Sequence, residues 1–194
     1  MKNLRRDISR RRMLAASMAR VCGLASTALS RKIASNQHAE MHSTALIHAL
    51  RSIGKPVCTA AADALAILPP RQAGFDLHLR RAGLDEADAR ILAEGMLQPN
   101  DGGGRFLTSF SASYNAEFGD AGAAVLAAAL PVMVAELGLV SCAIGDAGGR
   151  AILNWVQAAT DLQMVCVERN QFLAEMKSRF RDFARRKAYV LLVV

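Results

Sequence analysis

Residues 134–148 read VAELGLVSCAIGDAG, and the spacing of their apolar residues changes within this one stretch. Leu137 and Leu139 stand at alternate places, which is typical of a short strand with one buried face. In the related stretch 119–130, GDAGAAVLAAAL, apolar residues recur at intervals of three and four, as they do along one face of a helix. The pattern therefore predicts short strands, each followed by a helix. The many Ala and Gly residues would let each helix pack closely against the strands.

The same pattern returns along the chain when four anchor positions are aligned: Ala82, Asn115, Cys142 and Asn170. They are 33, 27 and 28 residues apart, and the longest interval contains QPNDGGG at 98–104, a loop insertion. One further period before Ala82 lies Lys55. A degenerate first unit is expected there, with loosely placed apolar residues Ile47, Leu50, Val57, Leu65, Ala66 and Leu68.

These residues resemble the leucine-rich repeat family, in particular its long-repeat, ribonuclease-inhibitor-like subclass. Its units read L-x-x-L-x-L-x-x-N/C-x-I-G-D-x-G-A-x-x-L-A-x-A-L, and residues 119–130 match the second half of that pattern. The resemblance covers roughly residues 47–175 and weakens at both ends, where Lys55 and Ala82 replace the Asn or Cys. It implies an α/β solenoid with parallel strands on the concave face and helices on the convex face.

Residues 46–194 are expected to form this solenoid, with about four to five units, a capping helix at 173–187 and a packed strand at 190–194. Asn115, Cys142 and Asn170 would form a ladder of hydrogen bonds to backbone groups. That ladder would be incomplete, because a thiol donates only weakly and Ala82 cannot donate. The carboxylates of Asp85, Asp120 and Asp146 occupy equivalent turns, and each is expected to cap the helix of its own unit.

Residues 1–45 are expected to form a separate basic leader or targeting segment, either helical or disordered. Residues 1–32 carry nine bases and one acid, whereas the remainder of the chain is nearly neutral. An attached basic amphipathic helix is the favoured interpretation. A twin-arginine export motif at 9–14, an organelle transit peptide and the secretion leader of a bacterial effector remain alternatives. The charge distribution disfavours nucleic-acid binding by the folded part, and no apolar run is long enough to span a membrane.

The sequence contains no recognisable catalytic, metal or cofactor motif, so a noncatalytic protein is expected. The four cysteines lie far apart, and His38 and His42 have no evident third ligand. Free thiols fit a reducing compartment, so a cytoplasmic location is expected, with export into a host cell or organelle targeting as the alternative.

The places between the buried strand residues define a candidate protein-binding face. A mixture of Arg, Tyr, Met and scattered acids suits protein recognition better than nucleic-acid recognition. The predicted partner-binding residues are His78, Arg80, Arg81, Ser111, Ser113, Tyr114, Glu136, Val140, Met164, Glu168 and Arg169.

Three functions follow as hypotheses. The first is a protein-interaction scaffold that binds an unidentified partner through its strand face. The second places that scaffold in a secreted bacterial effector that binds a host protein, with the basic N-terminus as export leader. A remote third, suggested by a GTPase activator of the same repeat subclass, is a GTPase-activating role, for which no residue of this chain stands out.

Overall fold

The computed structural model describes residues 44–68, 74–98, 104 and 106–194. The predictions for the leader at 1–45 fall almost entirely outside these residues, as does most of the loop insertion at 98–104. None of the described helices is both long and apolar enough to cross a membrane.

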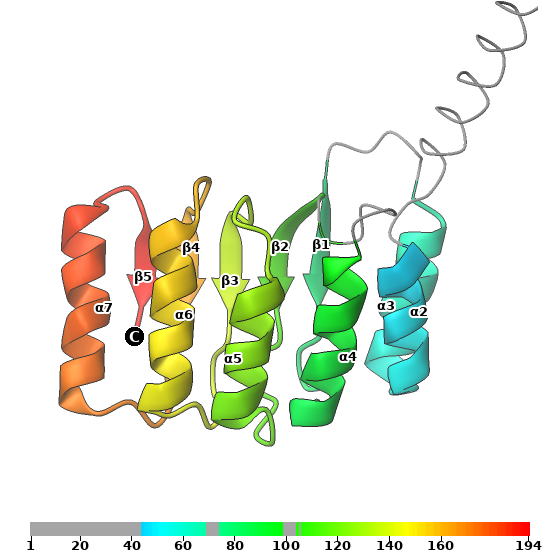
Figure 1. The fold of residues 1–194 in the computed structure, drawn as a ribbon, viewed down its shortest axis with the longest axis horizontal. Coiled ribbons are helices and arrows are strands. Elements are labelled where there is room, and N and C mark those ends of the chain that lie inside the picture. The colour runs from blue at the N-terminus through cyan, green and yellow to red at the C-terminus, as the bar shows by residue number, and fades with distance from the viewer. Residues whose placement is uncertain (1–43, 69–73, 99–103, 105) are drawn as a thin grey trace, which may run out of the picture. The chain divides into compact units, whose positions relative to one another are not determined.

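The described residues form an α/β structure built on one parallel sheet (Figure 1). The strands follow one another in chain order, β1-β2-β3-β4-β5, and every neighbouring pair is parallel. Because parallel neighbours need a crossover, one helix separates each strand from the next. The strands are β1 (Phe75–His78), β2 (Leu107–Ser111), β3 (Glu136–Gly138), β4 (Met164–Cys166) and β5 (Leu191–Val193). The helices are α2 (Thr44–Ile53), α3 (Pro56–Ala66), α4 (Glu86–Leu97), α5 (Gly119–Ala129), α6 (Asp146–Ala158) and α7 (Ala174–Arg186).

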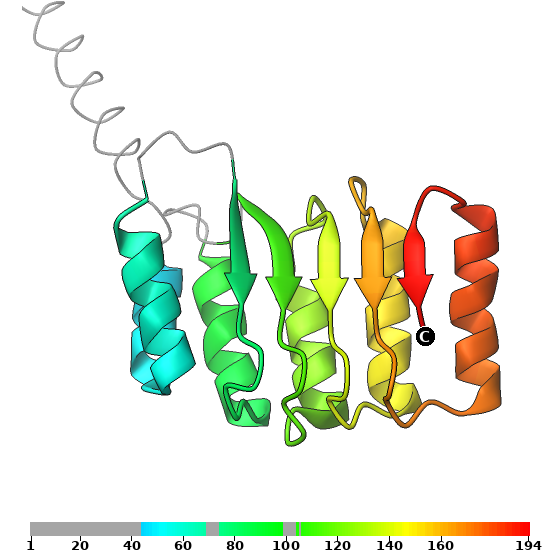
Figure 2. The same ribbon diagram turned by 180° about the vertical axis from the view of Figure 1, so that it is seen from behind.

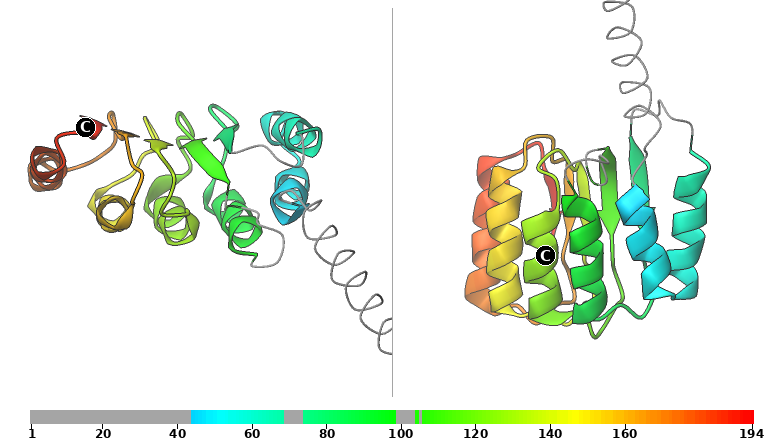
Figure 3. Two further views of the ribbon diagram at one scale, coloured as in Figure 1. Left: turned by 90° about the horizontal axis from the view of Figure 1, so that it is seen from above. Right: turned by 45° about the vertical axis from the view of Figure 1, so that its right-hand side comes forward.

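Helices cover one face of the sheet, and no described helix lies over the other, which is here called the open face (Figures 2 and 3). Leu77, Phe110, Leu137 and Val165 lie opposite one another on successive strands and are buried between the strands and helices. Small residues let neighbouring helices pack closely. At Gly148, for example, a Cβ would come within 2.7 Å of Ile144 and 2.8 Å of Asp120. The core is therefore one continuous layer of mostly aliphatic side chains.

The segment before β1 differs from the expected degenerate first unit. Residues 44–66 form two helices, α2 and α3, and contribute no strand among the described residues. Leu46, Ile47 and Leu50 lie on one buried face of α2. Their spacing also fits the apolar positions of a repeat unit loosely, so the sequence pattern could not distinguish a helix from a degenerate unit here. Pro56 begins α3 at a position that proline favours, directly after Lys55.

The C-terminal segment agrees with the sequence expectation. Residues 174–186 are helical and bury Met176, Phe180 and Phe183, and β5 pairs with β4, which confirms the packed strand. In Figure 3, α7 lies at the end of the row of helices, beyond β5. Leu191 on β5 nevertheless remains 61% exposed.

Candidate functional site

The open face of the sheet is built from rows of side chains that cross the strands. The first row contains Asp76, Ser109, Glu136, Met164 and Leu191, one from each strand in register. The second row contains His78, Ser111, Gly138, Cys166 and Val193. Because side chains alternate along a strand, residues of both rows point away from the helices.

Beyond the strands, four turns share one unusual backbone conformation. Arg81, Tyr114, Ser141 and Arg169 have φ values of 53, 65, 53 and 58°, in the left-handed region that residues with a side chain rarely adopt. Each precedes one of the four anchor positions, and the first three donate a backbone hydrogen bond to the following turn. These hydrogen bonds join neighbouring turns beyond the C-terminal ends of β1 to β4, at one edge of the open face.

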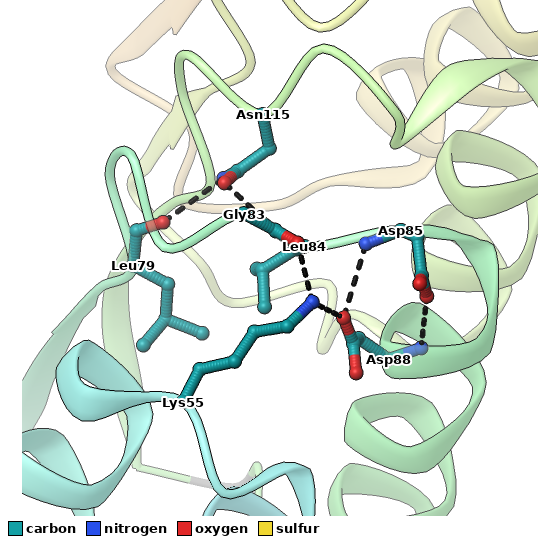
Figure 4. A network of polar contacts seen from close by, with 7 residues as sticks. All are labelled: Lys55, Leu79, Gly83, Leu84, Asp85, Asp88 and Asn115. Carbon is teal, nitrogen blue, oxygen red and sulfur yellow. Dashed lines mark hydrogen bonds and ion pairs between the residues drawn. The ribbon is translucent and has the colours of Figure 1, made fainter.

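The ladder residue Asn115 is 1% exposed and holds the first of these turns. Its amide nitrogen donates to the carbonyls of Leu79 (3.0 Å) and Ala112 (2.7 Å), and its Oδ1 accepts from the backbone N–H of Leu84 (3.0 Å). Figure 4 shows the contacts with Leu79 and Leu84. One buried side chain thus forms hydrogen bonds with three backbone groups.

Asn170 repeats this arrangement two units later. Its amide nitrogen donates to the carbonyls of Leu139 (2.7 Å) and Val167 (2.9 Å), while Oδ1 accepts from the N–H groups of Cys142 (2.9 Å) and Ile144 (3.2 Å). Between them, the Cys142 thiol donates toward the carbonyls of Ala112 (3.2 Å) and Val140 (3.4 Å). The three ladder residues therefore form hydrogen bonds in successive turns. The two asparagines use an amide group for these bonds, whereas Cys142 uses only its thiol.

Asp85 caps its own helix, as expected. Its carboxylate accepts from the N–H of Asp88 (3.0 Å), and the Asp88 carboxylate accepts from the N–H of Asp85 (3.1 Å), which completes a capping box. The hydrogen bond from the Asp88 backbone keeps the pKa of Asp85 below its usual value.

The expectation that Asp120 and Asp146 also cap their own helices is wrong. Asp120 lies inside the first turn of α5, and its Oδ1 accepts from the N–H groups of Gly145 (2.7 Å) and Gly148 (2.8 Å) at the start of α6. Asp146 likewise accepts from the N–H of Leu173 (2.9 Å), just before α7. Stacking places each carboxylate beside the positive N-terminal end of the next helix, which attracts it.

Lys55 connects the α2–α3 pair to the first strand–helix unit (Figure 4). Its ammonium group donates to the carbonyl oxygen of Gly83 and forms an ion pair with Asp88, whose side chain is 11% exposed. Burial lowers the pKa of Lys55, but the hydrogen bond and charge of Asp88 outweigh it, so the pKa is raised. Lys55 is thus a structural connection and not part of the open face.

The open face is hollowed into one groove of about 360 Å³ that extends over β1 to β4. Of the predicted partner-binding residues, nine line it: His78, Arg80, Ser111, Ser113, Tyr114, Glu136, Val140, Met164 and Glu168. Arg81 and Arg169, which lie in left-handed turns beyond β1 and β4, do not line the groove.

Further lining residues were absent from the predicted set, among them Ser109, Gly138 and Cys166. The alternation of apolar residues in the sequence already places all three at outward strand positions. Gly138 matters most for shape, because a Cβ there would meet Ser111 Oγ at 2.8 Å. The missing side chain therefore lets Ser111 and Ser113 lie close over β3.

A chain of polar contacts crosses the first three strands inside the groove. His78 Nε2 lies 3.2 Å from Ser109 Oγ, and that hydroxyl donates to Glu136 Oε2 at 3.1 Å. In a hydrolase triad the imidazole lies between the hydroxyl and the carboxylate, whereas here the hydroxyl lies between the other two. The contacts therefore orient His78 and Glu136 rather than activate Ser109.

Tyr114 holds two guanidinium groups at the β1–β2 end of the groove. The Cζ atoms of Arg80 and Arg81 each lie 5.0 Å from the centroid of its ring. Both arginines are exposed, and neither forms an ion pair within the part of the chain that the structure describes. Each arginine therefore has a cation–π contact with the same ring, and neither has an acidic partner among the described residues.

The described cysteines are all free thiols in different surroundings. Burial raises the pKa of Cys58 to about 11 and also raises that of Cys142. Cys166 is partly exposed in the groove, and burial together with the charges of Glu168 and Glu136 raises its pKa. Across the described residues, no three His, Cys, Asp or Glu side chains gather as metal ligands would.

No protein-family model matches this chain, and no curated protein resembles it significantly.

Proposed function

We propose that this chain is a leucine-rich repeat solenoid of the ribonuclease-inhibitor-like type and that it acts as a noncatalytic protein-interaction scaffold. The partner would bind on the open strand face. The observation that carries the proposal is the groove across β1–β4, where polar, charged and apolar side chains from four strands form one accessible surface.

Three features support the solenoid part of the proposal. The strands follow chain order in one parallel sheet, the four turns share a left-handed residue at corresponding places, and Asn115 and Asn170 make corresponding hydrogen bonds. Such regularity is typical of stacked units that bury their faces only against neighbours.

The groove also has the composition of a recognition surface. Tyr and Arg, which often anchor protein interfaces, lie at one end, and Val140 and Met164 provide apolar contact in the middle. Glu136 and Glu168 add acidic groups, so the face carries both signs of charge.

Affinity capture from an extract of the source cells tests the proposal with two matched variants. Ser111→Arg places a bulky side chain in the groove, whereas Ser178→Arg adds the same side chain to the exposed surface of α7. A protein retained by the wild type and by Ser178→Arg, but lost with Ser111→Arg, is expected. Equal retention by all three would contradict the proposal, provided that circular dichroism shows the variants to be folded.

A further inference from the structure

The proton of one buried hydroxyl group determines how His78 faces the groove. Ser109 is 7% exposed, and its only O–H donates to Glu136 Oε2 at 3.1 Å. A carboxylate only accepts, so turning this proton toward the imidazole would leave two acceptor oxygens in contact. His78 Nε2 lies 3.2 Å from the same hydroxyl oxygen, which therefore accepts from it. The arrangement thus requires a proton on Nε2 of His78.

The second ring nitrogen of His78 is then a hydrogen-bond acceptor without a donor. In a neutral imidazole that carries its proton on Nε2, Nδ1 presents a lone pair. Within the described part of the chain, His78 forms no hydrogen bond apart from the one with Ser109. His78 is exposed and lines the groove, so a partner bound there can donate to Nδ1.

Protonation of His78 would reverse this property. The charged and titratable side chains nearest to it on the open face are Asp76 and Arg80 on the same strand, Tyr114 after β2 and Glu136 on β3. Among these residue types, histidine is the one that changes charge between about pH 5 and 8. Acidification in this range turns Nδ1 from an acceptor into a donor and adds one positive charge to the groove.

We infer that the groove is a pH-sensitive recognition surface, in which a partner donates an N–H group to His78 Nδ1 at neutral pH and is released when the imidazole is protonated. This inference rests on the proposed scaffold function. The N–H belongs to a backbone amide or to a Lys or Arg side chain, because an oxygen without a proton would meet the lone pair of Nδ1.

Two-bond ¹H–¹⁵N correlation spectra of the full chain test the position of the proton. At pH 7.5 the His78 ring, identified by its absence from the spectrum of His78→Gln, should carry its proton on Nε2. Its hydrogen bond should also slow exchange of that proton with water relative to His48, an exposed ring with no hydrogen bond among the described residues. A proton on Nδ1, or exchange as fast as that of His48, would overturn the inference.

A peptide probe tests the release on acidification. Random 12-residue peptides are selected on the full chain at pH 7.5 and eluted at pH 5.5, and an enriched peptide is then measured at both pH values. The wild type should bind it about tenfold more weakly at pH 5.5, because a hydrogen bond is lost and a charge is added. His78→Gln retains an N–H for Ser109 but cannot be protonated, so its affinity should change by less than about twofold. The control His48→Gln removes an exposed imidazole on α2 and should respond as the wild type does.

An absence of peptides released at pH 5.5, or the same weakening in His78→Gln as in the wild type, would overturn the inference. The proposed scaffold fails differently. If the captured protein is lost with Ser111→Arg yet is retained equally at pH 7.5 and 5.5, the scaffold stands and the pH-sensitive contact is wrong. If Ser111→Arg leaves its retention unchanged, the scaffold itself is wrong.

Discussion

At the scale of single residues, the anchor side chains occupy corresponding turns but form different hydrogen bonds. Asn115 and Asn170 offer an acceptor as well as donors, and each satisfies backbone N–H and C=O groups together. Cys142 supplies only a thiol. The sequence predicted this ladder because the spacing of the anchors is visible, and the chemistry of each side chain then sets its strength.

Replacing the ladder residues by alanine should therefore destabilise the fold to different degrees. Asn115→Ala leaves buried backbone groups unpaired and should lower the free energy of unfolding by about 2–4 kcal/mol. Cys142→Ala removes a weak donor and a small volume, so about 1–2 kcal/mol is expected. Urea denaturation measures both. An equal or reversed order would show that the amide is not the stronger support.

The thiols should react with alkylating reagents in an order set by their burial. In a Cys22→Ser background, iodoacetamide should modify Cys166 in the native protein while Cys58 and Cys142 stay protected until unfolding, because both are fully buried. Peptide mass spectrometry identifies the modified residue. Native-state modification of Cys142 ahead of Cys166 would contradict the described burial.

At the scale of elements, the connections between neighbouring units were harder to foresee. The pattern placed Asp85, Asp120 and Asp146 in equivalent turns, but only the stacked structure reveals that the last two reach across to the next unit. The spacing of residues along the sequence shows where an Asp lies relative to its own helix. It does not show how far that Asp lies from the helix of the next unit. The α2–α3 pair was missed for a related reason, since its sparse apolar residues fit two periods.

Asp120→Ala tests the connection between α5 and α6. The variant should lose about 1 kcal/mol of stability, which is typical of a lost helix cap. The diagnostic result is the location of the change, because Gly145 and Gly148 lose their acceptor. Hydrogen exchange should therefore accelerate at the start of α6. Acceleration confined to α5 would restore the own-helix interpretation.

The Lys55–Asp88 connection should make stability depend on pH in the alkaline range. The pKa of Lys55 is raised in the folded state, so its contribution is complete below about pH 10.5 and disappears as pH rises through the folded pKa. Lys55→Met should remove this part of the alkaline loss, which thermal melts from pH 8 to 11.5 would reveal. Cys58, with its pKa raised to about 11, destabilises in the same direction above pH 9, so both proteins carry Cys58→Ala.

At the scale of the whole molecule, the division into a helical face and an open strand face was predictable from the sequence. The change of apolar spacing within one stretch specified a strand followed by a helix, and its recurrence specified the stacking order. The shape of the groove was not predictable to the same extent. Ser111 lies close over Gly138, and Arg81 and Arg169 do not line the groove. Both features depend on the register between strands and on how the turns place their side chains, which the spacing of apolar residues does not specify.

The central claim is that the strand face, and not the helical face, is the interaction surface. Its most direct test is site-specific photo-crosslinking in the source cells, with benzoylphenylalanine in place of Ser111 in the groove or Ser178 on α7. A discrete covalent adduct with another protein from position 111, and none from position 178, is the expected result. An adduct from position 178 alone, or no adduct from position 111, would contradict the claim.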